Sequence, residues 1–132
     1  MSRTEISTLG EFGLIDHLTE GLIPSNASTK KGVGDDCAVL DYSAGANKTR
    51  TLVTSDMLME GIHFDLVYTP LTHLGYKAAM VNLSDVYAMN GTPRQMVVNL
   101  AISRRFSIED MEDLYAGIRM ACEKHHVDII GG

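Results

Sequence analysis

The sequence predicts an α+β fold, in which a mixed or antiparallel four-stranded sheet is layered with helices. Two observations lead to this prediction. Short β-branched and apolar runs, each bounded by turn residues, are typical of strands. Longer segments between them carry apolar residues at helical spacing. The predicted order along the chain is helix, β-hairpin, helix, strand, helix, strand.

Composition indicates an ordinary soluble protein. The chain has 132 residues, of which 45% are hydrophobic and 21% charged, so we expect one domain over residues 1–132. A net charge of −6 argues against nucleic-acid binding, which requires a basic surface. There is no apolar run long enough to span a membrane and no signal peptide pattern. Cys37 and Cys122 are far apart, so we expect a reduced, cytoplasmic setting.

The first predicted helix covers residues 8–20, with Thr8 and Glu11 as a capping box. Its apolar stripe consists of Leu9, Phe12, Ile15 and Leu18. The polar, glycine-containing segment 24–34 that follows is predicted to be a loop. Its two lysines, Lys30 and Lys31, belong either to an ordinary solvated surface or to a loop that faces phosphate.

A β-hairpin is predicted next, from strands at 37–42 and 49–54 joined by a turn at 43–48. The first strand is preceded by Gly34-Asp35-Asp36, and the second ends in Thr54-Ser55-Asp56. Antiparallel pairing places the start of one strand beside the end of the other. We therefore expect Asp36 and Asp56 at the same end of the sheet.

The segment Thr54-Ser55-Asp56 offers one carboxylate and two hydroxyl oxygens at the end of a strand. Hard oxygen ligands of this kind suit magnesium, which often keeps some of its waters. The other interpretation is that Asp56 only caps a turn, because Ser and Asp are common turn residues.

The second predicted helix runs from Thr69 and Pro70 to about Met89, with Asn90-Gly91 as its end signal. Asn82 and Asp85 are three residues apart and share a face of this helix. Asp85 lies among apolar residues in the sequence. If its carboxylate is buried, it needs a cation or a hydrogen-bond donor as partner; the other interpretation is an ordinary aspartate that faces solvent.

Three more elements complete the chain. Residues 94–103 are predicted to form a central strand, because apolar side chains alternate onto both faces. Ser107 and Asp110 start the third helix as a cap, and Val127–Ile130 form a last strand before Gly131-Gly132. A strand followed by two glycines is an unusual end for a domain, so we expect a further segment beyond this chain.

Four motifs together resemble the N-terminal domain of thiamine-monophosphate kinases, within the aminoimidazole-ribotide-synthase-related (PurM-like) superfamily. The motifs are GVGDDCAVL, TSDMLMEGIHF, NLSDVYAMNGTPRQMVVNLAI and DIIGG. Their order and spacing both match, and the resemblance covers nearly the whole chain. It implies an enzyme that transfers the γ-phosphoryl group of ATP directly to thiamine monophosphate with the help of several Mg²⁺ ions. It also implies a homodimer formed through the N-terminal sheets.

The resemblance also implies roles for individual residues. The metal ligands would be Asp36, Thr54, Ser55, Asp56 and Asp85. His63 would contact the phosphate of thiamine monophosphate, and Tyr115 and Gly132 would contact the nucleotide. In the family a magnesium-binding aspartate and a whole C-terminal domain follow the Gly-Gly pair, and this chain ends before both. We therefore expect the 132-residue chain alone to be inactive.

Direct phosphoryl transfer fits the residues present. Such chemistry needs positioning and charge neutralisation more than a strong base, and the sequence has no P-loop motif. Two other interpretations stay open. In the first, the chain is part of another ATP-dependent member of the superfamily, such as a purine-pathway or selenophosphate-type synthase. In the second, it is a non-catalytic dimerisation module.

Overall fold

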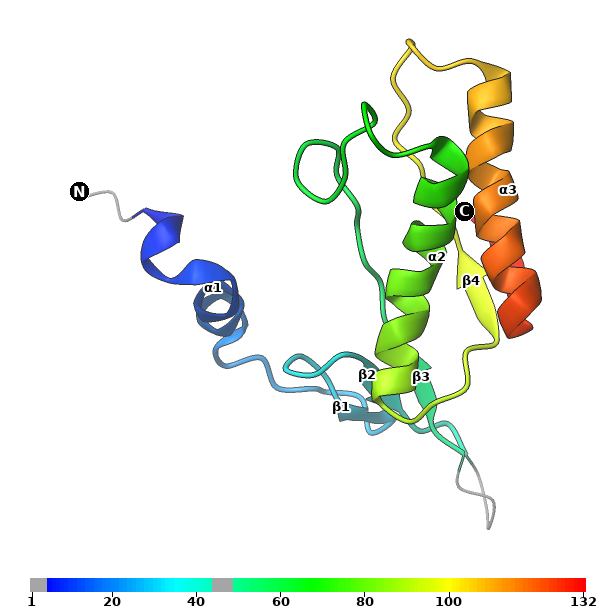
Figure 1. The fold of residues 1–132 in the computed structure, drawn as a ribbon. Coiled ribbons are helices and arrows are strands. Elements are labelled where there is room, and N and C mark those ends of the chain that lie inside the picture. The colour runs from blue at the N-terminus through cyan, green and yellow to red at the C-terminus, as the bar shows by residue number, and fades with distance from the viewer. Residues whose placement is uncertain (1–4, 44–48) are drawn as a thin grey trace. The chain divides into compact units, whose positions relative to one another are not determined.

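The computed structural model describes residues 5–43 and 49–132, and the chain divides into two compact units, Met1–Val53 and Thr54–Gly132. The first unit contains a 3₁₀ turn, η1 (Ile6–Thr8), and then α1 (Gly10–Thr19), β1 (Thr29–Lys31), β2 (Ala38–Leu40) and β3 (Thr51–Val53). The second contains α2 (Leu71–Ala88), β4 (Gln95–Val97), α3 (Ile108–His125) and β5 (Asp128–Gly131) (Figure 1).

The hairpin of the first unit is confirmed. Strands β2 and β3 pair antiparallel, with Ala38 opposite Val53 and Leu40 opposite Thr51. The predicted turn between them lies partly outside the described residues. The predicted loop 24–34 is wrong at Thr29–Lys31, which forms β1 on the outer edge of β2. A polar segment forms a strand here because the edge of β2 supplies partners for its backbone groups, which outweighs its local preference for a loop.

Helix α1 begins two residues later than predicted. Ile6–Thr8 forms the separate 3₁₀ turn, and Leu9 caps the helix without a side-chain hydrogen bond, so the Thr8–Glu11 capping box is wrong. Gly10 has a φ of +69°, a left-handed conformation that interrupts the helix at this point. The predicted apolar stripe is exposed within this unit, and Phe12 is 80% accessible.

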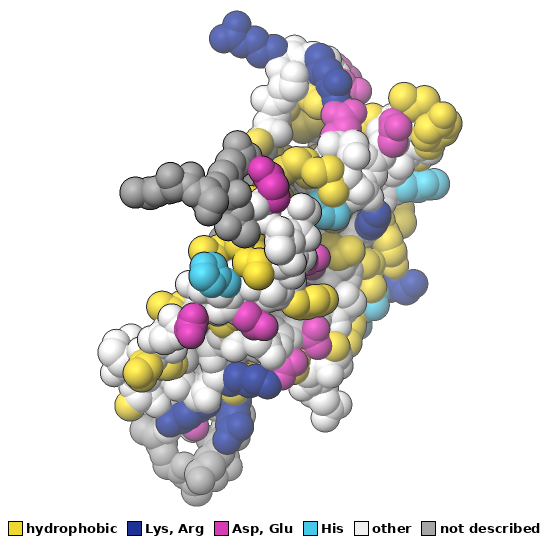
Figure 2. Space-filling view, turned by 90° about the vertical axis from the view of Figure 1, so that its left-hand side faces the viewer, with side chains coloured by type: hydrophobic (Ala, Val, Ile, Leu, Met, Phe, Trp, Pro, Cys, Tyr) yellow, Lys and Arg dark blue, Asp and Glu magenta, His cyan; other side chains and the backbone are white. Residues whose placement is uncertain are grey.

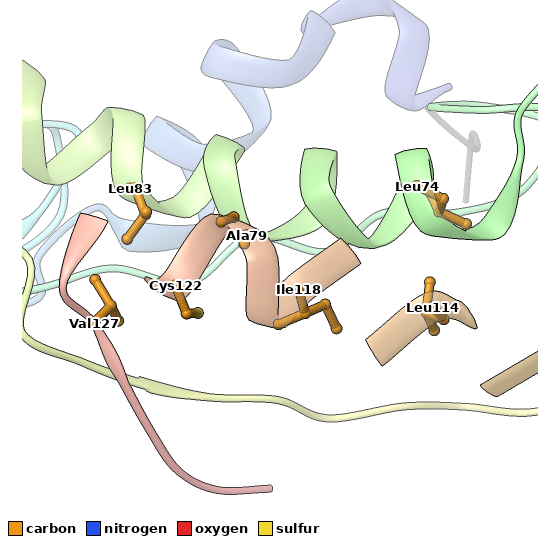
Figure 3. Packing of buried hydrophobic residues seen from close by; sticks show 8 residues of the cluster. Leu74, Ala79, Leu83, Leu114, Ile118, Cys122 and Val127 are labelled. Atoms are coloured by element: carbon orange, nitrogen blue, oxygen red, sulfur yellow. The ribbon is translucent and has the colours of Figure 1, made fainter. Parts of the chain in front are cut away.

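In the second unit, α2 and α3 run side by side in the same direction (Figure 1). Helix α3 connects the parallel strands β4 and β5, in which Met96 lies opposite Ile129. The buried core lies between the two helices and the start of β5 (Figure 3) and consists of Leu74, Ala79, Leu83, Leu114, Ile118, Ala121, Cys122 and Val127. This packing fixes the orientation of α2, the helix that carries Asn82 and Asp85 of the candidate site.

Two glycines set the distance between the helices. A Cβ at Gly75 would lie 1.9 Å from the carbonyl oxygen of Leu114, and a Cβ at Gly117 would lie 1.9 Å from that of Thr72. Both distances are far below van der Waals contact. The helix backbones therefore touch at these positions, and no other residue fits there without moving a helix.

The single four-stranded sheet is not what the structure shows. In the described ranges, β1, β2 and β3 form an antiparallel sheet, and β4 and β5 form a separate parallel pair. The strand predicted over 94–103 ends at Val97, and within 5–43 and 49–132 it pairs with β5 alone. Its predicted central position is therefore wrong for this chain. Apolar side chains that a second layer was expected to cover are exposed, with Val97 at 60% and Ile102 at 53%. Hydrophobic side chains also reach the surface on the face that Figure 2 shows.

The ends of the long helices follow the sequence closely. Pro70 is the N-cap of α2 rather than its first residue, and Asn90 has the left-handed φ of 55° expected after a helix end. Ser107 and Asp110 form the predicted capping box of α3. The last strand is shifted by one residue, to Asp128–Gly131. None of the helices in the described part of the chain is both long and apolar enough to cross a membrane.

Candidate metal and phosphate site

Two distant motifs meet on one face of α2. The hydroxyl of Thr54 donates a hydrogen bond of 3.0 Å to Asp85 Oδ2. The backbone N–H of Asp56 donates one of 2.8 Å to Asn82 Oδ1. Asn82 is oriented in turn by its own amide nitrogen, which donates to the Ala78 carbonyl at 3.0 Å. The segment that follows β3 is thus attached to the helix by two side chains one turn apart.

This arrangement brings two carboxylates together. Partial burial raises the pKa of Asp56 above its ordinary value, the negative charge of Asp85 raises it further, and His63 lowers it. The two effects that raise the pKa indicate that the Asp56 carboxylate is partly desolvated and is close enough to Asp85 to be repelled by it. A bound cation would relieve that repulsion.

The oxygen donors here fit magnesium. The second unit supplies the carboxylates of Asp56 and Asp85, and Thr54 and Ser55 add neutral hydroxyl oxygens nearby in the chain. Within residues 5–43 and 49–132, no three His, Cys, Asp or Glu side chains form a group that could hold a metal by themselves. A magnesium site does not require three such side chains, because the ion is commonly bound through one or two carboxylates together with waters and substrate phosphates.

The two adjacent aspartates of the first unit have different surroundings. Asp35 accepts hydrogen bonds from the Lys31 ammonium and from the backbone N–H of Asp36, and both interactions lower the pKa of its carboxyl. The side chain of Asp36 has no hydrogen-bond or ion-pair partner in the described part of the chain. Asp36 is therefore the aspartate of this pair that is available to a ligand. Its convergence with Asp56 and Asp85 stays a prediction.

The two lysines of β1, Lys30 and Lys31, are engaged by nearby residues of the chain. Lys30 Nζ donates to the Ala27 carbonyl at 2.7 Å, and Lys31 forms an ion pair with Asp35. Both ammonium groups therefore bind residues three and four positions away in the chain, as on an ordinary solvated surface.

His63 lies in a turn between β3 and α2. The backbone N–H of Met59 donates to His63 Nδ1 at 2.9 Å. Because a backbone N–H can only donate, Nδ1 must carry the lone pair, and the neutral ring holds its proton on Nε2. The side chain is exposed. It therefore offers an N–H donor that suits a phosphate oxygen.

The two predicted nucleotide contacts lie on different elements. Tyr115 lines a groove along α3, together with Ile108, Met111, Glu112, Ala116 and Arg119. Gly132 directly follows β5 and has a φ of +141°, and a Cβ there would lie 1.7 Å from the Val98 carbonyl oxygen. Only glycine fits that close backbone approach. Tyr115 therefore lies on α3 and Gly132 follows β5, and their contact with one nucleotide stays a prediction.

Two residues beside this site were not predicted as site residues. In the sequence pattern Asn82 stands out only as a neighbour of Asp85, and no motif indicates a role for Lys77. The Lys77 ammonium donates to the His63 carbonyl at 2.7 Å. The sequence does hold a signal for Lys77: positions 77, 81 and 85 are spaced i, i+4, i+8, which places Lys77 on the same face of α2 as Asp85.

Fold and site together define a domain that gathers aspartates and hydroxyls beside a helix. Residues 34–132 match the family described as "AIR synthase related protein, N-terminal domain", and the chain belongs to this family. The match covers all of the elements from β2 onward.

Several thiamine-monophosphate kinases are similar to this chain in sequence. The enzyme of Aquifex aeolicus is 35% identical over 127 residues, which is 96% of this chain and 38% of that protein. The enzyme of Bacillus subtilis is 34% identical over 124 residues, or 94% of this chain and 37% of that protein. The chain thus spans less than two fifths of the length of these relatives.

Solved structures agree with the sequence comparisons. The structure described as "AaThiL complexed with AMPPCP and TMP" has a TM-score of 0.83 and 32% identity, covering 100% of this chain and 39% of that one. The crystal structure of thiamine monophosphate kinase from Aquifex aeolicus has a TM-score of 0.70 and 29% identity, covering 98% of this chain and 38% of that one.

Proposed function

We propose that this chain is the N-terminal, metal- and ATP-binding part of a longer kinase that phosphorylates thiamine monophosphate to thiamine diphosphate. Geometry supports the class of reaction: two carboxylates and a hydroxyl from motifs far apart in the sequence meet on α2. Similarity supports the substrates, because relatives at 34–35% identity are thiamine-monophosphate kinases and one similar structure holds AMPPCP and TMP.

In this proposal Asp36, Thr54, Ser55, Asp56 and Asp85 hold Mg²⁺. Bound magnesium would neutralise the negative charge of the ATP phosphates, which is the main requirement of phosphoryl transfer. The protein's own part is positioning. Thr54 orients the Asp85 carboxylate, Asn82 holds the backbone of Asp56, and His63 offers Nε2–H to the phosphate of thiamine monophosphate. Tyr115 and Gly132 belong to the nucleotide side of the site.

We also propose that the protein is a homodimer. The exposed apolar side chains on and after β4, including Val97, Leu100 and Ile102, have exposed fractions of 60%, 42% and 53%. An unpaired strand with an apolar surface tends to pair with another chain. The sheet of a second copy would cover this surface.

Thiamine diphosphate formation by the full-length protein tests the proposed function, with magnesium and ATP present. The expected result is turnover that depends on both thiamine monophosphate and magnesium. The 132-residue chain serves as the comparison and is expected to bind divalent metal weakly and to show no turnover, because small misplacements cost large factors in rate. A rate within about tenfold of the full-length protein would contradict this account of the site. No turnover of thiamine monophosphate by the full-length protein would contradict the proposed function.

A further inference from the structure

The turn that carries His63 is closed by its own backbone. The Gly61 N–H donates to the Phe64 carbonyl at 2.8 Å, and the His63 N–H donates to the Met59 carbonyl at 2.9 Å. Gly61 has a φ of +79°, which only glycine adopts readily. Leu58 and Phe64, near the two ends of the turn, pack against the core. The turn is thus a compact unit that reaches the rest of the protein through few contacts.

Lys77 is the polar connection between this turn and α2. Its ammonium donates to the His63 carbonyl at 2.7 Å, and a hydrogen bond from a charged donor is stronger than one between neutral groups. The helix beneath it is a stable support, because Leu74 is buried and Gly75 touches the backbone of α3. In the described part of the chain, no other side chain hydrogen-bonds to the backbone of His63.

A second connection to the turn is weaker. Arg105 forms an ion pair with Glu60, and its guanidinium lies 4.9 Å from the centre of the Phe106 ring. Both ion-pair partners are well exposed, at 56% and 41%. Exposed pairs of this kind contribute little, because water screens them. Lys77 is exposed as well, but its hydrogen bond reaches the His63 backbone itself, whereas the ion pair of Arg105 reaches only the side chain of Glu60. Lys77 is therefore the contact on which the position of the His63 backbone mainly depends.

We propose that Lys77 is a positioning residue of the substrate site: it holds the His63 carbonyl so that the turn stays closed and His63 Nε2–H keeps its direction. This inference rests on the proposed role of His63 in binding the phosphate of thiamine monophosphate. Lys77 acts through His63 and needs no contact with the substrate. Without its hydrogen bond, the turn gains alternative conformations, and the Met59 N–H no longer holds Nδ1.

The first test is the steady-state kinetics of the full-length protein carrying Lys77→Met, which keeps the chain length but removes the donor. We expect the KM for thiamine monophosphate to rise about tenfold, while the KM for ATP changes little. Lys77→Arg restores a charged donor and should recover most of the affinity. Lys124→Met is the matched control, because Lys124 is also exposed and, among the described residues, its ammonium hydrogen-bonds only to the Tyr76 hydroxyl, at 3.5 Å. It should leave both KM values unchanged.

The second test reads the His63 ring directly. Long-range ¹H–¹⁵N correlation spectra distinguish the two neutral tautomers. We expect the Nε2–H tautomer in the unsubstituted protein and in Lys124→Met, and a mixture of tautomers in Lys77→Met. The unfolding temperature is measured for every variant, so that a general loss of stability is recognised.

Three outcomes separate the inference from its alternatives. An unchanged tautomer together with an unchanged KM for thiamine monophosphate in Lys77→Met would overturn it. An equal rise in both KM values with a fall in unfolding temperature would assign Lys77 a merely structural role, and would also overturn it. If the full-length protein does not phosphorylate thiamine monophosphate at all, the proposed function fails, and the tautomer spectra still decide whether Lys77 positions His63.

Discussion

Thr54 and Asp85 are 31 residues apart in the sequence, and the Thr54 hydroxyl donates a hydrogen bond of 3.0 Å to Asp85 Oδ2. This bond joins the segment after β3 to the last turn of α2. It satisfies one lone pair of a carboxylate that is partly buried among apolar neighbours and leaves the other oxygen for a ligand. The relationship makes a direct prediction about the hydroxyl.

Removing the Thr54 hydroxyl should weaken metal binding by the full-length protein. Thr54→Val keeps the shape but leaves Asp85 without its donor, and a hydrogen bond to a charged group is commonly worth about 1.5–3 kcal/mol. We expect the magnesium concentration for half-maximal activity to rise about tenfold. Thr54→Ser retains the hydroxyl and should stay near the original value. Equal magnesium requirements for Thr54→Val and Thr54→Ser would contradict the assignment.

Asp56→Asn should remove most of the turnover of the full-length protein. The substitution preserves size but removes the charge that, together with Asp85, attracts a divalent cation. The measurement is turnover at saturating magnesium. Asp113→Asn is the control, because Asp113 is exposed on α3 and has no hydrogen-bond or ion-pair partner in the described part of the chain. Near-normal turnover of Asp56→Asn would exclude Asp56 as a metal ligand.

His63→Ala should weaken the binding of thiamine monophosphate more than that of ATP. Phosphoryl transfer to a phosphate oxygen needs no strong base, so the expected loss lies in substrate affinity rather than in proton transfer. The measurement compares the two KM values. His73→Ala provides the control, since His73 is an exposed histidine at the start of α2. A change confined to the KM for ATP would move His63 to the nucleotide side of the site.

Gly75→Ala should destabilise the chain strongly. The added Cβ would lie 1.9 Å from the Leu114 carbonyl oxygen, and a backbone atom cannot move aside as a flexible side chain can. We expect a loss of about 3 kcal/mol, the upper end of the usual cost of overpacking. Gly13→Ala is the matched control in α1, where the nearest atom would be Leu9 Cβ at 3.4 Å, and it should be neutral or slightly stabilising. Chemical denaturation measures both, and similar midpoints would contradict the close contact of α2 and α3.

Light scattering tests the proposed homodimer. At tens of micromolar, about the range in which weak specific interfaces assemble, the chain should show the mass of two copies. Ile102→Lys places a charge on the exposed apolar surface after β4 and should shift the mass towards one copy. Val67→Lys changes an apolar side chain that is 79% exposed but lies outside that surface. A monomer mass for the unsubstituted chain would count against association.

The local elements followed from the sequence because their signals are local. Ser107 and Asp110 predict the start of α3 through hydrogen bonds within a single turn, and the structure has both. Asn90 predicts the end of α2 because asparagine tolerates a left-handed backbone. The hairpin of β2 and β3 was also predictable, since the two strands are close in the chain. The family followed from motifs that lie along the whole sequence.

Pairing between distant segments was not predictable in the same way. Thr29–Lys31 has no strand pattern of its own and becomes β1 because the edge of β2 supplies its partners. The alternation over 94–103 predicts a long central strand, yet only Gln95–Val97 finds a partner in the described chain.

The sequence by itself determined which residue types this protein brings to its candidate site: the aspartates, the hydroxyls and one histidine. The tertiary structure alone decided how they are held. Asn82 binds the backbone of Asp56, Lys77 binds the backbone of His63, and Lys31 engages Asp35 but leaves Asp36 available. The physical reason is that a side chain's partner depends on which backbones the packing of α2 against α3 and the pairing of strands bring within about 3 Å, and no local pattern encodes that distance.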